Sequence, residues 1–131
     1  MTAYWIFIID DTNISSFRKN LIYGFNLRNR NLYDKIGESD QIILYVKPKR
    51  LDGCYQIVRK LSNSAYKFPV GDYSLQMEVK VIKKSPELFE LRQANIDNIS
   101  IFKGKLWGPV LMGRPAVKIT QQDYIYLKNL L

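Results

Sequence analysis

Residues 73–82 carry the clearest structural signal in the chain, a regular alternation of apolar and polar side chains. Every second residue of this segment is apolar, and these residues are Leu75, Met77, Val79 and Val81. A period of two is typical of a β-strand with one buried face, because successive side chains point to opposite sides of the strand. The chain is therefore predicted to build its fold around a β-sheet.

Other segments read as further strands. Tyr4–Ile9 and Gln41–Val46 are short, nearly continuous apolar runs, rich in aromatic and β-branched residues, and such runs are typical of buried strands. Gly53–Lys60 mixes apolar and polar residues as a third strand would, and a last extended piece is expected to end at Ile119. Strands thus dominate the predicted structure.

Three short helices are predicted between or after these strands. Asn13 is a plausible N-cap for a helix over Ile14–Asn20. Ser85-Pro86-Glu87 has the serine, proline and acidic residue that favour a helix start. Thr120–Asp123 resembles a capping box. The helix that follows it has an apolar stripe at helical spacing, made of Tyr124, Leu127 and Leu131 and broadened by Ile125 and Leu130.

The order of these elements narrows the fold class. Strands and helices do not alternate along the chain, so a doubly wound parallel sheet is not expected. No internal repeat, low-complexity tract or Pro/Gly/Ser-rich linker divides the 131 residues, which are predicted to form a single domain over 1–131. We expect an α+β domain in which a small mixed sheet curls toward an open barrel and helices pack at its ends.

Composition excludes several classes of chemistry. The chain has no histidine and one cysteine, which excludes Ser-His-Asp and Cys-His catalysis, histidine metal sites and a disulfide framework. Cys54 lies in a strand-like run and is interpreted as a small buried hydrophobe. No phosphate-binding glycine motif is present, no apolar run reaches the roughly 20 residues of a membrane span, and the first residues lack a basic signal region. We expect a cytoplasmic protein that is not an enzyme and needs no metal or cofactor.

Charge points to a polyanionic partner. The net charge is +8 and the pI is near 9.6, which is in the range of basic nucleic-acid-binding domains, although a soluble protein can also tolerate such a surface. Residues 18–35 contain five basic residues, with Asn26, Asn29 and Asn31 among them, and are interpreted as a polar basic loop suited to phosphate contacts. No basic amphipathic helix suggests a membrane surface.

Aromatic residues make up 13% of the chain, and some of them lie beside turns rather than inside strands. These residues are Tyr23, Phe68, Tyr73 and Trp107. Aromatic side chains near a basic loop can form a stacking platform for a nucleobase, and they can equally belong to the core. Composition alone leaves both interpretations open.

Several segments, taken in order, resemble the EVE domain family over nearly the whole chain. The first three are the strand Tyr4–Ile8, the element Ile22-Tyr23-Gly24-Phe25, and the Gly/Asp turn and strand of residues 36–45. Residues 53–57 resemble the next strand of the family. The segments 111–114 and 119–124 resemble its closing loop and capped C-terminal helix.

This resemblance implies a PUA-like fold close to that of the YTH domains, which read methylated adenine in RNA. EVE domains are regarded as readers of modified bases that accept a flipped-out base into an aromatic cage. The resemblance therefore implies binding of DNA or RNA that carries a modified base, methylated cytosine or adenine, and suggests a modification-dependent restriction or RNA-modification system as the setting.

The resemblance also assigns roles to individual residues. Tyr23 falls where related domains have a tryptophan of the cage, so it is expected to stack on the base. Asp10 or Asp11 is expected to meet the base edge, and Phe68 or Tyr73 to form another wall. The expected phosphate contacts are Arg114, Arg28 and Arg30. Trp5 matches the tryptophan of the family's first strand and belongs either to the site or to the core.

Other interpretations stay open at this stage. Asp10 and Asp11 also read as a turn and helix-entry signal, since adjacent residues on a strand point to opposite faces. A small hydrolase of the ASCH type, which is also PUA-like, would need a lysine or glutamate in the cleft, and Lys47 and Glu78 are available. A ligand-free adaptor domain is the third possibility.

Overall fold

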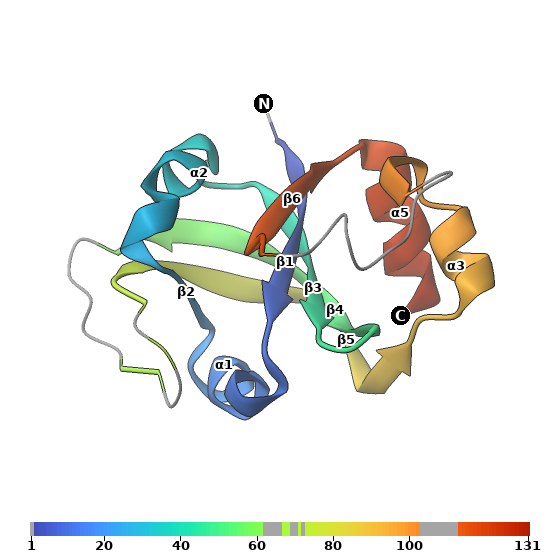
Figure 1. Ribbon diagram of the computed structural model, residues 1–131, viewed down its shortest axis with the longest axis horizontal. Helices are drawn as coiled ribbons and strands as arrows, with labels where there is room; N and C mark the ends of the chain where they lie inside the picture. The colour runs from blue at the N-terminus through green and yellow to red at the C-terminus, as the bar shows by residue number, and fades with distance from the viewer. Residues whose placement is uncertain (1, 62–66, 69–70, 72, 103–112) are drawn as a thin grey trace.

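The structure is a computed structural model that describes residues 2–61, 67–68, 71, 73–102 and 113–131. A six-stranded sheet with the strand order β2-β5-β4-β3-β1-β6 forms the framework (Figure 1). Only β1 and β3 are parallel, and the other neighbours are antiparallel. The strands are β1 (Tyr4–Ile9), β2 (Ile22–Phe25), β3 (Gln41–Val46), β4 (Arg50–Lys60), β5 (Leu75–Glu90) and β6 (Ala116–Ile119).

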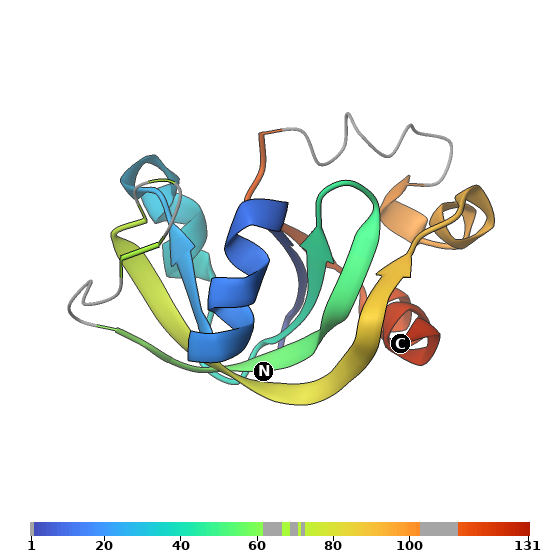
Figure 2. The same ribbon diagram turned by 90° about the horizontal axis from the view of Figure 1, so that it is seen from below.

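The sheet curls into a half-barrel, and Figure 2 shows its strands curving around α1. Four short α-helices lie in the part of the chain that the structure describes: α1 (Ile14–Asn20), α2 (Arg30–Lys35), α3 (Gln93–Asp97) and α5 (Gln121–Leu130). Three 3-10 turns accompany them: η1 (Asp11–Asn13), η2 (Leu27–Asn29) and η3 (Ser100–Phe102). The predicted α+β class, with a curled and mostly antiparallel sheet and a C-terminal helix, is confirmed.

Two hydrophobic cores lie on opposite faces of the sheet, and β1 contributes to both. Trp5, Phe7 and Ile9 pack into the core that also contains residues of α1 and α2, whereas Ile6 and Ile8 pack into the core formed with α3 and α5. A strand buried on both faces has no polar side to show, and this explains why Tyr4–Ile9 and Gln41–Val46 read as continuous apolar runs. Both strands have the predicted bounds.

Helix α1 is held inside the half-barrel by one apolar and one ionic contact. Phe17 is fully buried, and its ring meets that of Tyr55 edge to face with the centroids 5.0 Å apart. On the next residue, the Arg18 guanidinium forms an ion pair with Asp52, a fully buried carboxylate that also accepts a hydrogen bond from the Tyr55 hydroxyl. A buried carboxylate needs such partners to offset its desolvation. The predicted helix has the expected bounds, although the Asn13 side chain makes no capping hydrogen bond.

Asp40 ties the N-terminal strand to the turn before β3. Its carboxylate accepts hydrogen bonds from the indole Nε1 of Trp5 at 3.0 Å, from the Ala3 amide at 3.0 Å and from the Gly37 amide at 2.9 Å. Asp40 is 3% exposed and Trp5 is 4% exposed. Trp5 therefore belongs to the core, one of the two roles that the sequence left open.

The helix predicted at Ser85-Pro86-Glu87 is wrong, because these residues lie within β5. Strand β4 pairs with β5 on both sides of them, through Gly53↔Lys84 and Leu51↔Phe89, and the register shifts in between. Proline is tolerated at such an irregularity because no ladder hydrogen bond is required of it there. The pairing with β4 thus outweighs a local helix-start signal.

The basic loop predicted over residues 18–35 is also wrong, since this stretch contains the end of α1, strand β2, turn η2 and helix α2. The reason is burial. Tyr23, Phe25 and Tyr33 are each less than a tenth exposed, and Leu32 packs against the same core. The apolar residues between the charges direct the folding of this segment. Its charged side chains remain exposed except that of Arg18, which is paired with the buried Asp52.

The C-terminal helix α5 follows its predicted cap, because the Thr120 hydroxyl accepts a hydrogen bond from the Asp123 amide at 3.1 Å. The Asp123 carboxylate, however, binds the amide and hydroxyl of Ser100 in η3 instead of completing a capping box.

Ile125 and Val81, both expected on buried faces, are 49% and 46% exposed. Beside Val81 the pairing of β5 with β4 shifts register, which interrupts the alternation. Within the described ranges, no helix has the length and apolar character that crossing a membrane requires.

Candidate functional site

A pocket of about 280 Å³ opens where the two edges of the curled sheet approach each other. Strand β2 forms one edge. The end of β1 and the residues that lead into β6 form the other. The lining combines three aromatic side chains, one carboxylate, three cations and three asparagines with backbone at three glycines. The pocket therefore offers both apolar and polar groups, as a site that orients a flat polar ligand requires.

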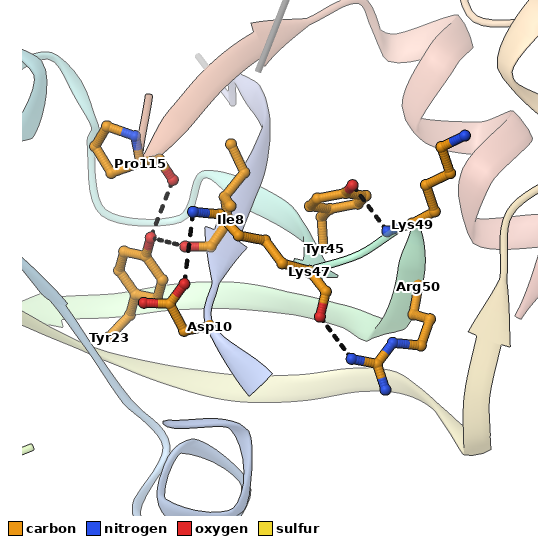
Figure 3. Close-up of polar contacts among 8 residues, drawn as sticks. All are labelled: Ile8, Asp10, Tyr23, Tyr45, Lys47, Lys49, Arg50 and Pro115. Atoms are coloured by element: carbon orange, nitrogen blue, oxygen red, sulfur yellow. Dashed lines mark hydrogen bonds and ion pairs between the residues drawn. The ribbon is translucent and has the colours of Figure 1, made fainter. Parts of the chain in front are cut away.

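Tyr23 spans the seam between the two edges. Its hydroxyl donates to the carbonyl of Ile8 at 2.5 Å, and the carbonyl of Pro115 lies 3.0 Å away (Figure 3). Its ring packs on Phe7 and Phe25, with centroids 4.6 and 5.0 Å away. Burial raises the pKa of this hydroxyl far above its ordinary value of 10.0, so it stays protonated and can act as a donor. Tyr23 thus borders the pocket but is 4% exposed.

Phe68 and Tyr73 form a second aromatic wall, with ring centroids 5.2 Å apart and nearly perpendicular planes. Phe68 is buried, and Tyr73 is the more exposed of the two. Gly24 permits this arrangement. A Cβ atom at position 24 would lie 2.5 Å from the Cβ of Tyr73 and 2.7 Å from the Cε2 of Phe68. Burial, and after it the charge of Asp10, raises the pKa of Tyr73. The glycine in β2 therefore lets two aromatic rings approach the backbone of the strand.

Asp10 supplies the carboxylate of the pocket, directly after β1 ends. Its Oδ1 lies 3.5 Å from the Nζ of Lys47, which comes from the turn between β3 and β4 (Figure 3). Both side chains remain partly exposed, Asp10 at 43% and Lys47 at 59%. Asn13, also in the lining, is 2% exposed. A hydrogen-bond acceptor and a donor thus lie side by side and accessible at this end of the pocket.

Arg50 fastens the turn that carries Lys47. Its Nη2 donates to the Lys47 carbonyl at 2.5 Å (Figure 3). The same atom donates to the Asp11 carboxylate at 2.8 Å. Close to it, the Lys49 amide donates to the Tyr45 hydroxyl at 2.8 Å. Asp11 therefore helps to hold the turn of Lys47 through Arg50 and does not line the pocket. Its role differs in this from that of Asp10.

Two arginines lie on the polar side. Arg28 comes from the turn η2, whose shape is held by the Asn26 side chain accepting from the Arg28 amide at 3.0 Å. Arg114 precedes β6 and is exposed. Both line the pocket, together with Asn26 and Asn29. Exposed guanidinium groups at a pocket mouth are suited to bidentate contacts with phosphate.

The tertiary structure brings six of the predicted residues together and leaves three elsewhere. The six that line the pocket are Asp10, Tyr23, Arg28, Phe68, Tyr73 and Arg114. Trp5 is bound to Asp40, Asp11 to Arg50, and Arg30 lies 3.7 Å from Asp34 in an exposed pair on α2. Trp107, another aromatic residue that the sequence predicts to lie beside a turn, falls outside the described residues.

The sequence did not assign Asn13 to the site, and Lys47 appeared in it as one of the basic residues and as an available lysine for a hydrolase. Asn13 had a local signal as a helix cap, which concealed its position in the lining. Lys47 carried no signal of its own, since its neighbourhood depends on the hairpin that returns it to the end of β1. Glu78 lies apart from the pocket lining, 2.8 Å from Arg59.

Solved structures with this architecture include several YTH domains. The Mmi1 YTH domain has a TM-score of 0.71 at 16% identity, over 98% of this chain and 74% of that one. The YTH domain of Zygosaccharomyces rouxii MRB1, solved in complex with N6-methyladenosine RNA, has a TM-score of 0.67 at 12% identity, over 98% and 83%. A hypothetical protein from Leishmania major has a TM-score of 0.64 at 14% identity, over 99% and 94%.

Among curated proteins, a UPF0310 protein of Pyrococcus abyssi is 22% identical over 144 residues, which is 98% of this chain and 99% of that protein. No protein-family model matches the chain. At these identities the similarity is one of fold, and the fold is that of the YTH domains.

Proposed function

We propose that this chain is a non-catalytic, EVE-type reader of nucleic acid that accepts one flipped, modified base into the pocket between β2 and β1. The observation that carries the proposal is the composition of that pocket. Phe68, Tyr73 and Tyr23 line a space of about 280 Å³ together with a carboxylate and three cations. A nucleotide has the matching parts, a flat apolar face, a hydrogen-bonding edge and a phosphate.

The size of the pocket favours a single base. Sites for small molecules have volumes of roughly 300–1,000 Å³, so this pocket is at the lower limit of that range. Asp10 offers an acceptor for an exocyclic amine, and Lys47 beside it offers a donor. Arg28 and Arg114 are accessible to phosphates at the mouth. In the proposed complex the aromatic rings bind the face of the base and Asp10 binds its edge.

The free energies are compatible with selection of a modified base. Extruding a paired base costs a few kcal/mol, and less from a single strand. Stacking on aromatic side chains returns roughly 1–3 kcal/mol per base. A buried methyl group adds about 0.8 kcal/mol, which is a preference of about fourfold. A larger preference would need a polar group in the pocket that the unmodified base leaves without a partner.

Fluorescence anisotropy with short oligonucleotides tests the proposal. Single strands and duplexes would carry one base that is unmodified, N6-methyladenine, 5-methylcytosine or 5-hydroxymethylcytosine, as RNA and as DNA, at two salt concentrations. N6-methyladenine in RNA is the first probe because it is bound by a protein of the same fold. We expect tighter binding of one modified base at both salt concentrations.

Matched variants separate the pocket from general charge. Tyr73→Ala removes an aromatic wall that is only partly buried, so we expect it to abolish the preference for the modified base while the protein stays folded. Arg114→Ala should weaken the binding of all oligonucleotides. It should also lower the slope of log affinity against log salt concentration by roughly 0.7 on single strands. Arg59→Ala, which removes the same charge outside the pocket lining, is the control. Salt-sensitive binding without any base preference would refute the proposal that the chain reads a modified base.

One observation keeps a hydrolase of the ASCH type as a second candidate. The Lys47 ammonium lies 3.5 Å from the Asp10 carboxylate and in the pocket, where a lysine and an acid could act on a bound nucleoside. Incubation with modified nucleosides, followed by chromatography, tests this function. Product that forms with the wild type and not with Lys47→Met would favour the hydrolase over the reader.

A further inference from the structure

A second hollow lies between helix α2 and strand β6, and it continues from the pocket. This open groove has a volume of about 500 Å³. It shares four residues with the pocket, namely Asn29, Gly113, Arg114 and Pro115. The groove is therefore continuous with the pocket mouth, and a chain-like ligand with one group in the pocket could lie along it.

The charge of the groove has one sign. Lys35, in the last turn of α2, and Lys118, on β6, are both exposed, and Arg114 stands where groove and pocket meet. None of the described residues that line the groove is acidic. Leu32 is the half-buried apolar side chain that α2 contributes to the lining, whereas the side chain of Val117 packs into the core on the other face of the sheet. Two lysines and an arginine along the groove suit a nucleic-acid strand whose phosphates meet the cations, and Leu32 offers an apolar contact to a base.

Strand β6 is an edge of the sheet, and a free edge can also accept a peptide strand. Two features of β6 argue against that occupant. The strand has four residues, and Lys118 places a charge on it, as edges that avoid strand addition commonly do. The charge of the groove and its continuity with the pocket favour a nucleic-acid strand.

We propose that the strand on one side of the flipped nucleotide lies in the groove between α2 and β6, with its phosphates at Lys35 and Lys118. This inference rests on the proposed function, because it takes the flipped base as its starting point. It adds that the footprint is one-sided. Nucleotides on one flank of the modified base contribute affinity through the groove, and those on the other flank do not.

The test uses two series of single-stranded oligonucleotides with the preferred modified base, or with N6-methyladenine if none is preferred. One series is extended by one to four nucleotides only on the 5′ side, and the other only on the 3′ side. Affinities are measured at several salt concentrations for the wild type and for the double variant Lys35→Ala/Lys118→Ala. The control, Lys80→Ala/Lys84→Ala, removes two exposed lysines of β5 that lie outside the groove lining.

We expect the groove variant to lose about tenfold in affinity at low salt in one series only, and its salt slope to fall by roughly 0.7 per lysine. The control variant should keep the wild-type affinity in that series. Equal losses in both series, or a loss no greater than that of the control, would overturn the inference. Binding of a peptide library in place of oligonucleotides would do the same.

The outcome for the proposed function is separate. If modified and unmodified oligonucleotides bind equally, the reader fails, while a one-sided loss in the groove variant still supports the groove. If the modified base is preferred and the losses are not one-sided, the groove fails and the reader stands. A wild type that binds no oligonucleotide refutes both. All four sites of substitution are exposed, so circular dichroism should show unchanged folding.

Discussion

The Tyr23 hydroxyl donates to the carbonyl of Ile8 at 2.5 Å across the open seam of the half-barrel. Tyr23 belongs to β2 and Ile8 to β1, which lie near opposite edges of the sheet. The carbonyl of Pro115, just before β6, is 3.0 Å from the same hydroxyl and also accepts the Ile8 amide at 2.8 Å. One side chain therefore connects the two edges at the base of the pocket, where the sheet has no backbone ladder to do so.

Tyr23→Phe should lower the free energy of unfolding by about 1–2 kcal/mol, because a buried hydrogen bond is lost while the ring contacts with Phe7 and Phe25 remain. Urea denaturation measures the change. Tyr126→Phe is the control, since its hydroxyl has long and partly exposed contacts of 3.3 Å, and should have little effect. Equal stability of Tyr23→Phe and wild type would show that the hydroxyl does not hold the seam.

Tyr23→Ala is unsuitable as a binding variant, because loss of the buried ring costs roughly 3–5 kcal/mol.

Gly24→Ala should damage the pocket more than the fold. The new Cβ would meet the Cβ of Tyr73 at 2.5 Å and the ring of Phe68 at 2.7 Å, so both rings must move. We expect loss of any base preference and a stability cost of roughly 1–3 kcal/mol. Gly37→Ala is the matched control, because its nearest contact would be the Asp40 Oδ1 at an ordinary 3.7 Å. Base preference is measured by anisotropy and stability by urea denaturation for both variants. An unchanged base preference in Gly24→Ala would show that Phe68 and Tyr73 do not form the wall that binds the base.

Arg50→Lys tests whether the turn that carries Lys47 must be held in place. A lysine keeps the charge but cannot reproduce the two hydrogen bonds from Nη2 to Lys47 and Asp11. We expect a several-fold loss of affinity for the modified base, with a change in stability below about 1 kcal/mol because the pair with Asp11 is exposed. Arg59→Lys, whose partner Glu78 lies outside the pocket lining, should bind as the wild type does. Equal binding by both variants would contradict a positioning role for Arg50.

Stability should fall in alkaline solution because of buried tyrosines. Burial raises the pKa of Tyr23 and, together with the neighbouring Asp52, that of Tyr55 above the ordinary 10.0. The folded state then retains protons that the unfolded state releases. The stabilisation is complete below pH 10 and is lost as the pH rises above it, by about 1.4 kcal/mol per pH unit for each such tyrosine.

Urea midpoints between pH 8 and pH 11 measure this slope. Tyr55→Phe should have a shallower slope than the wild type above pH 10, whatever its stability at neutral pH. Tyr126→Phe, at a half-buried tyrosine, serves as the control. Parallel slopes for Tyr55→Phe and wild type would show that Tyr55 does not contribute.

Asp40→Asn should destabilise the fold through the N-terminal strand. An amide can accept with one oxygen only, so one or two of the donors from Ala3, Trp5 and Gly37 lose their partner. The expected cost is about 1–3 kcal/mol, which is typical of buried donors left unsatisfied. Asp34→Asn, in an exposed pair on α2, is the control and should change stability by less than about 0.5 kcal/mol. A wild-type midpoint for Asp40→Asn would contradict the anchoring role.

Elements with local signals could be predicted from the amino-acid sequence alone. Tyr4–Ile9, Gln41–Val46 and the helix Ile14–Asn20 have the predicted bounds, because apolar runs and helix spacing reflect burial and periodicity within a few residues. The cap at Thr120 is local in the same sense. The curled, mostly antiparallel sheet followed from the order of these elements and from the resemblance to EVE domains.

Features that depend on residues far apart in the chain became visible only in the folded protein. Pro86 lies in a strand because β4 pairs with β5 on both sides of it, and no local pattern contains that pairing. The roles of Asp10 and Asp11 separate because Lys47 and Arg50 return to them from the β3–β4 hairpin. Tyr23 is held by a carbonyl 15 residues earlier in the chain and approached by another 92 residues later. A pocket at a seam between sheet edges exists only after the sheet has curled, so the sequence could name its residues but not their distances or their burial.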